Sequence, residues 1–157
     1  MTTPRNRPVP LVALLLAAAL VASACGTITT TAPAPTPGDF QGIAAEIVSR
    51  GIVIDRLVSG DSGCTDHTLT QTAIGFDASG LDQPSVVRLR IYIFRDGEAY
   101  SRLRSTIDAC AATYQTDPAT LESVDDSPFV LVGQGPWGAA FEAALREALD
   151  VAAGTGG

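Results

Sequence analysis

The sequence has no lysine and only one histidine among its 157 residues. His67 cannot by itself supply the three protein ligands of a catalytic zinc site, and no H-E-x-x-H or calcium-loop pattern accompanies it. A serine triad would depend on the same histidine, and no G-x-S-x-G motif places a nucleophilic serine. We therefore expect no metal, no cofactor and no catalytic activity, with His67 an ordinary loop residue.

Positive charge is also scarce. The chain has 10 basic residues, all arginine, against 17 acidic ones. Arg5 and Arg7 precede the first apolar run and would leave with a cleaved leader, so the mature balance is 8 − 17 = −9. A negative protein gains nothing from nucleic-acid phosphates or anionic lipid headgroups. We expect no nucleic-acid partner and no electrostatic adhesion to a membrane.

The longest uninterrupted apolar run is too short to cross a bilayer. It covers 12 residues, 11–22, whereas a membrane-spanning helix needs about 20. Two arginines precede the run, which ends in the small residue Ala22 and is followed by Ser23 and Ala24. This order is typical of a secretory signal peptide.

Cys25 comes directly after those small residues. The segment resembles the lipobox of bacterial lipoproteins, in which the cysteine carries a diacylglycerol, although Ala22 stands where leucine is most frequent. The resemblance covers the first 25 residues. It implies cleavage before Cys25 and a lipid anchor at the outer, extracytoplasmic face of the cell membrane. Ordinary secretory cleavage after Ala24, or an uncleaved anchor, is the alternative.

The two remaining cysteines are Cys64 and Cys110. Thiols of exported proteins are normally paired, so assigning Cys25 to the lipid leaves these two as one possible disulfide. Cys110 also falls on the apolar stripe of an expected helix, which suits a structural bond. A nucleophilic or metal-binding cysteine is the competing interpretation.

Four segments follow from composition and hydrophobic pattern. We expect a signal peptide over residues 1–24, a lipidated cysteine with a Thr/Pro/Ala tether over 25–38, one domain over 39–153 and a flexible tail over 154–157. The tether has no periodic pattern of apolar residues that could form a buried face, so it should remain extended.

Within the domain, helices are expected at 39–50, after the N-cap Asp96 as far as Tyr114, and from Pro136 onward. Strands are expected at 52–58, 68–76, 86–94 and 129–132, with 77–84 as a connection. The order α-β-β-β-α-β-α has no βαβαβ succession. It predicts an α+β fold: a two-layer sandwich with a mainly antiparallel sheet of about four strands and helices packed on one face.

The strand at 86–94 suggests a binding surface. Arg88, Arg90 and Tyr92 alternate with apolar residues and therefore share one side. If that face is open, the two guanidinium groups could clamp the carboxylate of a small acidic ligand or of an envelope protein. Cross-strand salt bridges to the many carboxylates are the alternative and the stronger expectation.

Two other sequence patterns give weaker evidence for a functional site. Residues 133–138 fit G-x-G-x-x-G, but the chain ends 19 residues later without a second parallel strand, so we expect a tight turn whose free amides bind an anion weakly at most. Glu122, Asp125 and Asp126 lack the calcium-loop pattern and are expected in a solvated turn.

The combined interpretation is a small membrane-anchored extracytoplasmic lipoprotein that binds a ligand or a protein. An enzyme or enzyme accessory acting on cell-envelope material is the alternative. A concave pocket with convergent polar groups would favour the enzyme, and a flat open sheet face would favour the binding module.

Overall fold

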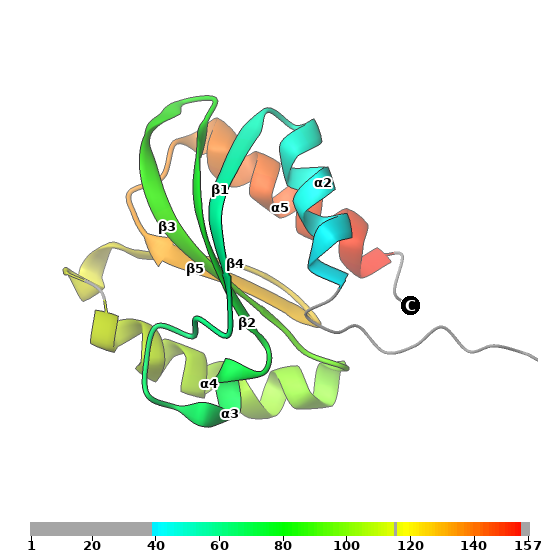
Figure 1. Cartoon of the computed structure of the whole chain (residues 1–157), viewed down its shortest axis with the longest axis vertical. Coiled ribbons are helices and arrows are strands. Elements are labelled where there is room, and N and C mark those ends of the chain that lie inside the picture. The colour runs from blue at the N-terminus through cyan, green and yellow to red at the C-terminus, as the bar shows by residue number, and fades with distance from the viewer. Residues whose placement is uncertain (1–38, 115, 155–157) are drawn as a thin grey trace, which may run out of the picture. The chain divides into compact units, whose positions relative to one another are not determined.

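A five-stranded antiparallel sheet forms the centre of the structure, a computed structural model that describes residues 39–114 and 116–154 (Figure 1). The strand order is β1-β2-β3-β5-β4. The strands are β1 (Ile52–Ser59), β2 (Ala73–Gly80), β3 (Gln83–Ile93), β4 (Leu121–Asp126) and β5 (Phe129–Gln134). The helices are α2 (Phe40–Ser49), α3 (His67–Thr70), α4 (Gly97–Tyr114) and α5 (Ala139–Gly154), with a 3-10 turn at Pro118–Thr120. The predicted α+β class with an antiparallel sheet is confirmed.

Helices cover both faces of the sheet rather than one. Figure 1 shows α2 and α5 on one side and α3 and α4 on the other. The first side buries Ile47, Phe76 and Leu131, and the second buries Ile107 and Val130. The pattern of β5 explains the second layer, because four consecutive apolar residues, Phe129–Val132, are buried and each face of the strand therefore needs a cover.

The β2–β3 hairpin lies where a connection was expected. Residues 77–80 end β2 and residues 83–84 begin β3, with a tight turn between them in which Leu81 has a φ of 54°. Pro84 had suggested that no strand runs through this segment, because proline cannot donate a backbone hydrogen bond. It is tolerated because β5 pairs only with Leu89–Ile93 of β3, so this end of β3 has β2 as its one neighbour.

The predicted strand at 68–76 is correct only in its second half. Residues 67–70 form the short helix α3, which starts where the Asp66 side chain accepts a hydrogen bond from the Thr68 amide at 2.8 Å. A side-chain cap of this kind stabilises the first turn of a helix. The strand itself begins at Ala73.

The prediction of a solvated turn at 122–126 is wrong. These residues belong to β4, an edge strand that pairs with β5 from Leu121 opposite Gln134 to Asp126 opposite Phe129. Only Val124 of the six residues is buried, so β4 lacks the apolar pattern of a strand. Charged side chains are common on edge strands because they discourage pairing with other chains.

The expected signal peptide, Cys25 and tether lie outside the described residues, as do residues 155–157. The described domain extends through Gly154 in α5, one residue beyond the predicted boundary. None of the helices in the described ranges is both long and apolar enough to cross a membrane.

Candidate functional site

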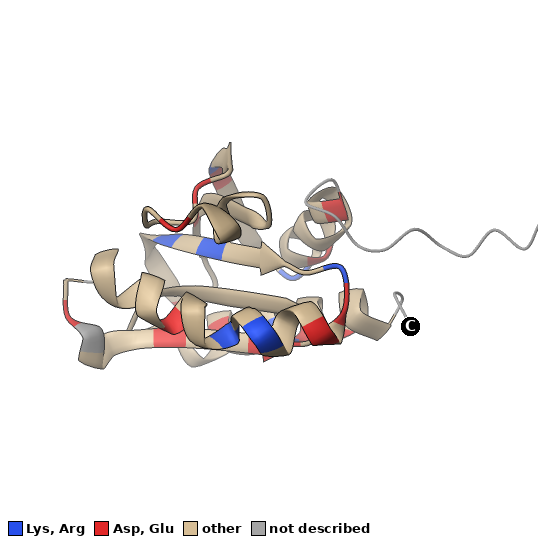
Figure 2. Ribbon diagram, turned by 90° about the horizontal axis from the view of Figure 1, so that it is seen from below, with Lys and Arg blue, Asp and Glu red and all other residues tan. Residues whose placement is uncertain are grey.

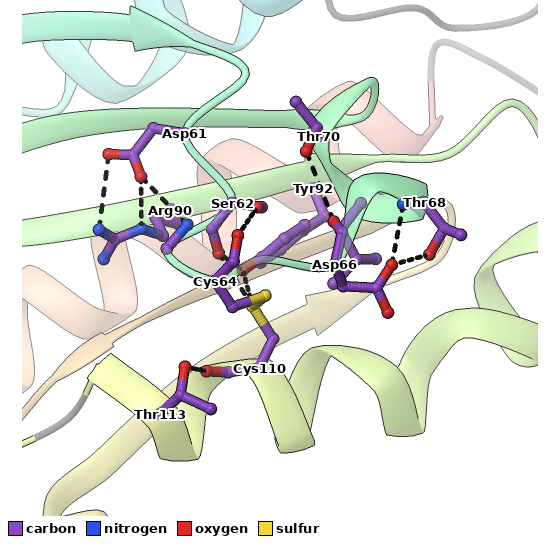
Figure 3. Close-up of a disulfide and its surroundings, with 12 residues drawn as sticks. Asp61, Ser62, Cys64, Asp66, Thr68, Thr70, Arg90, Tyr92, Cys110 and Thr113 are labelled. Atoms are coloured by element: carbon purple, nitrogen blue, oxygen red, sulfur yellow. Dashed lines mark hydrogen bonds and ion pairs between the residues drawn. A yellow bond between two sulfur atoms is a disulfide. The ribbon is translucent and has the colours of Figure 1, made fainter.

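A disulfide between Cys64 and Cys110 ties the loop after β1 to the C-terminal part of α4 (Figure 3). The two Cα atoms are 5.5 Å apart across a sequence separation of 46 residues. Cys110 is 4 % exposed and faces the second core, as its place in the apolar stripe predicted. The predicted pairing is confirmed, and a nucleophilic or metal-binding role for these cysteines does not apply to the bonded pair.

Tyr92 is not part of an open surface, which corrects the prediction. Its side chain is fully buried beneath the loop, and its hydroxyl donates a hydrogen bond to the Ser62 carbonyl oxygen at 2.8 Å. Burial raises the pKa of Tyr92, so the hydroxyl keeps its proton and remains a donor. Tyr92 therefore holds the loop in place and cannot touch a ligand at the surface.

Arg90 is also largely covered. Its Nε donates to Asp61 Oδ1 at 3.1 Å (Figure 3). Its guanidinium lies over the ring of Tyr114, 4.1 Å from the centroid. Stacking of this kind is a cation–π contact. Gly63 leaves room for it, since a Cβ there would approach both Arg90 and Tyr114 to 2.5 Å.

Arg88 lies between two carboxylates. It donates to Asp61 Oδ2 at 2.7 Å and to Asp77 Oδ1 at 3.1 Å, while Arg56 pairs with Asp77 from the other side. We call these five residues, Arg56, Arg88, Arg90, Asp61 and Asp77, the arginine–aspartate cluster. Asp77 is its buried centre, with a side chain only 6 % exposed.

The two carboxylates of the cluster stay ionised. Burial alone would raise the pKa of Asp61 and of Asp77, but hydrogen bonds from the surrounding guanidinium groups outweigh it and leave both pKa values below the usual range. Arg88 and Arg90 are therefore already engaged by the chain's own carboxylates. The salt-bridge alternative is confirmed, and the clamp for an external carboxylate is occupied from within.

Next to the cluster, an open hollow of about 260 Å³ lies on the part of the sheet formed by β1, β2 and β3. Val53 and Val86, two of the residues that line this hollow, are both 62 % exposed. Its lining residues are Val53, Asp55, Arg56, Asp77, Ala78, Ser79 and Val86. The hollow is the candidate binding site, and Arg56 and Asp77 connect it to the cluster.

Comparisons of the chain with protein-family models, with curated proteins and with solved structures find no match. Function has to be inferred from the geometry of the domain. Within residues 39–114 and 116–154, no three or more histidine, cysteine, aspartate or glutamate side chains are grouped so that they could hold a metal ion. His67 was expected in a loop, but it is the exposed first residue of the short helix α3, because the Asp66 side chain caps a helical turn there.

The glycine-rich turn at residues 133–138 does not offer free amides to an anion. The Asp82 carboxylate, from the β2–β3 turn, accepts hydrogen bonds from the amides of Ala140 and Phe141, each at 2.9 Å. These amides begin α5, which is the last element of the residues that the structure describes. The expected tight turn is present, and the weak anion site considered for it is filled by a side chain of the chain itself.

Sequence reasoning missed the site's main acidic members. Asp61 and Asp77 come from a loop and from a segment interpreted as a connection, so nothing local linked them to Arg88. The position of Asp77 becomes visible only with the β2–β3 register, in which it lies opposite Arg88. An opposite-charge pair across two strands is the signal that could have identified the hairpin.

Neighbouring carboxylates on β4 provide a first prediction. Burial and the nearby Asp150 raise the pKa of Asp126, whereas Asp125 is paired with Arg104 at 2.9 Å. Asp126→Asn should therefore increase the free energy of unfolding at pH 7 by about 0.3 kcal/mol, and Asp125→Asn should decrease it by a similar amount. Urea denaturation measures both changes.

The pH dependence checks the cause. The folded state raises the pKa of Asp126, so it binds a proton more readily than the unfolded chain and gains stability as the pH falls through that pKa. The advantage of Asp126→Asn should therefore shrink on acidification. A constant advantage from pH 7 down to pH 4 would contradict the proposed repulsion.

Proposed function

We propose that the mature chain is a lipid-anchored extracytoplasmic binding module, with Cys25 carrying the lipid and the domain presenting a surface to a ligand or an envelope protein. The Cys64–Cys110 disulfide is the observation that carries this proposal. Stable disulfides are typical of oxidising compartments, so the bond supports export. It also uses both other cysteines of the chain, which leaves Cys25 for the lipid.

The geometry of the candidate site supports binding more than catalysis. The hollow combines exposed valine walls with the carboxylates of Asp55 and Asp77 and the guanidinium of Arg56. Asp77 is kept ionised by its two arginine partners, and a general acid or base works best with a pKa near the ambient pH. An open, partly apolar surface of this kind suits contact with a partner.

The anchor is tested by following Cys25 in a bacterial host. The wild-type chain should be processed at Cys25, incorporate labelled palmitate and sediment with membranes. Cys25→Ala should accumulate as unprocessed precursor without label, as should the wild type under inhibition of lipoprotein signal peptidase. Mass spectrometry of the mature amino terminus identifies the modified residue.

A matched control uses the other two cysteines. The Cys64→Ser/Cys110→Ser double variant should still carry the lipid, because these residues are bonded to each other in the wild type. An unmodified mature amino terminus at a position other than 25, or palmitate on a residue other than Cys25, would refute the lipid anchor.

A further inference from the structure

Every arginine of the described domain is already paired with a carboxylate. In each of the eight, a guanidinium nitrogen lies within 3.7 Å of a carboxylate oxygen. The eight are Arg50, Arg56, Arg88, Arg90, Arg95, Arg102, Arg104 and Arg146. Figure 2 shows acidic and basic residues side by side along α4. With 17 acidic residues against eight arginines from position 39 onward, the surplus charge is negative. A positively charged partner would therefore be electrostatically complementary to this domain.

Most of the large exposed apolar side chains in the described residues belong to β1, to β3 and to the turn between β2 and β3. Of the seven large ones in the described residues, five belong to β1 and the β2–β3 hairpin: Val53, Leu57, Val58, Leu81 and Val86. The hollow lies between Val53 and Val86, and no residue of α4 lines it. An apolar surface beside a hollow is a common feature of protein interaction sites.

We propose that this hollow receives an arginine or lysine side chain from a protein partner. This inference rests on the proposed binding role and names the chemistry of the partner. Both side chains combine an aliphatic stem with a charged end. The stem would contact Val53 and Val86, and the charged end would approach the carboxylates of Asp55 and Asp77 that line the same hollow.

Arg56 shows how such a cation is held. It lies at the rim with its side chain 72 % exposed, and its guanidinium pairs with the buried carboxylate of Asp77. A partner's cation would share or replace this contact. Removing Arg56 should therefore strengthen binding of a basic ligand, whereas it would weaken binding of an acidic one.

The test uses the mature chain from residue 25 with Cys25→Ser, which prevents lipidation. This chain contains the whole domain, because both cores are built from residues between Phe40 and Ala153. The probes are two amidated peptides, acetyl-Leu-Arg-Val-Arg-Leu and acetyl-Leu-Glu-Val-Glu-Leu. Amide NMR signals of Val53, Ser79 and Val86 should shift saturably with the basic peptide and stay in place with the acidic one.

Charge-matched variants separate the hollow from general electrostatic attraction. In the wild type the Arg56 amide donates to Asp55 Oδ1 at 2.7 Å, and Asp55→Asn keeps an oxygen that can accept this hydrogen bond. The variant should weaken binding of the basic peptide about fivefold. Glu98→Gln removes one charge from α4 at a side chain that is 89 % exposed and should change affinity by less than about twofold. Arg56→Gln should tighten binding.

Three results would overturn the proposal. They are the absence of a saturable NMR shift with the basic peptide, an equal loss of affinity for that peptide in Asp55→Asn and Glu98→Gln, and tighter binding of the acidic peptide than of the basic one. Failure of the basic peptide to bind, with Cys25 lipidated in the host, removes only this inference and leaves the anchored module in place. Binding of the basic peptide by the Cys25→Ser chain, together with a wild-type chain that is not lipidated in the host, would instead remove the anchor and leave this inference in place.

Discussion

Replacing Cys64 and Cys110 together by serine should lower the free energy of unfolding by about 4 kcal/mol. The bond closes a loop of 46 residues, and releasing it returns the corresponding freedom to the unfolded chain. The loss is large relative to the 5–15 kcal/mol that typically stabilises a domain. Urea denaturation followed by the fluorescence of Trp137, the one tryptophan of the chain, measures the change.

Reduction provides the control for this experiment. A thiol reductant should lower the stability of the wild type to nearly that of the double variant and should leave the variant unchanged. Hydrogen exchange should also accelerate in residues 60–66, because the bond holds this loop against α4. A loss below about 1 kcal/mol would show that the bond contributes little to the folded domain.

Replacing Asp77 by alanine should cost about 3 kcal/mol. The variant removes a carboxylate that is 6 % exposed and leaves Arg88, itself 30 % exposed, with one of its two acidic partners. Breaking a buried ion pair typically costs 3–5 kcal/mol because the remaining charge stays desolvated. Asp61 still pairs with Arg88, so the lower end of that range is expected.

Asp108→Ala is the matched control. Asp108 also pairs with an arginine that has a second acidic partner, since Arg104 contacts Asp125 at 2.9 Å, but its side chain is 58 % exposed. An exposed pair contributes little, so the expected loss is about 0.5 kcal/mol or less. Equal losses in the two variants would show that burial of Asp77 has no special weight.

The contribution of Asp77 should disappear in acid. Its folded-state pKa lies below the unfolded value of about 4, so its contribution is present above that value and lost as the pH falls through the folded pKa. The difference in unfolding free energy between wild type and Asp77→Ala should therefore narrow below about pH 4. A difference that stays constant on acidification would show that lost packing, rather than lost charge, destabilises the variant.

Elements with a strong local signal were predicted well. The alternation of Leu89, Ile91 and Ile93 identified β3, and all three side chains are buried in the first core. The Asp96 cap marked the start of α4, where its carboxylate accepts a hydrogen bond from the Ala99 amide at 2.7 Å. Both signals are local, so no knowledge of distant residues was needed.

Elements stabilised by distant partners were missed. β4 buries one residue of six and exists because β5 supplies its hydrogen bonds. The second face of the sheet was expected to be wet because Arg88 and Arg90 lie on it, yet α4 and the disulfide-bonded loop cover Tyr92 on that same face. Side-chain alternation identifies which residues share a face, but it does not show what packs there.

The candidate site divides in the same way. The sequence placed Arg88 and Arg90 on one face, because strand periodicity is a property of a short segment, and it paired Cys64 with Cys110 by cysteine count. Tertiary structure decided which carboxylates reach those arginines and where the sheet stays open. Asp61 lies 27 residues before Arg88, and its position depends on the disulfide and the hairpin register. Contacts between distant segments arise from the packing of the whole chain, so local pattern does not contain them.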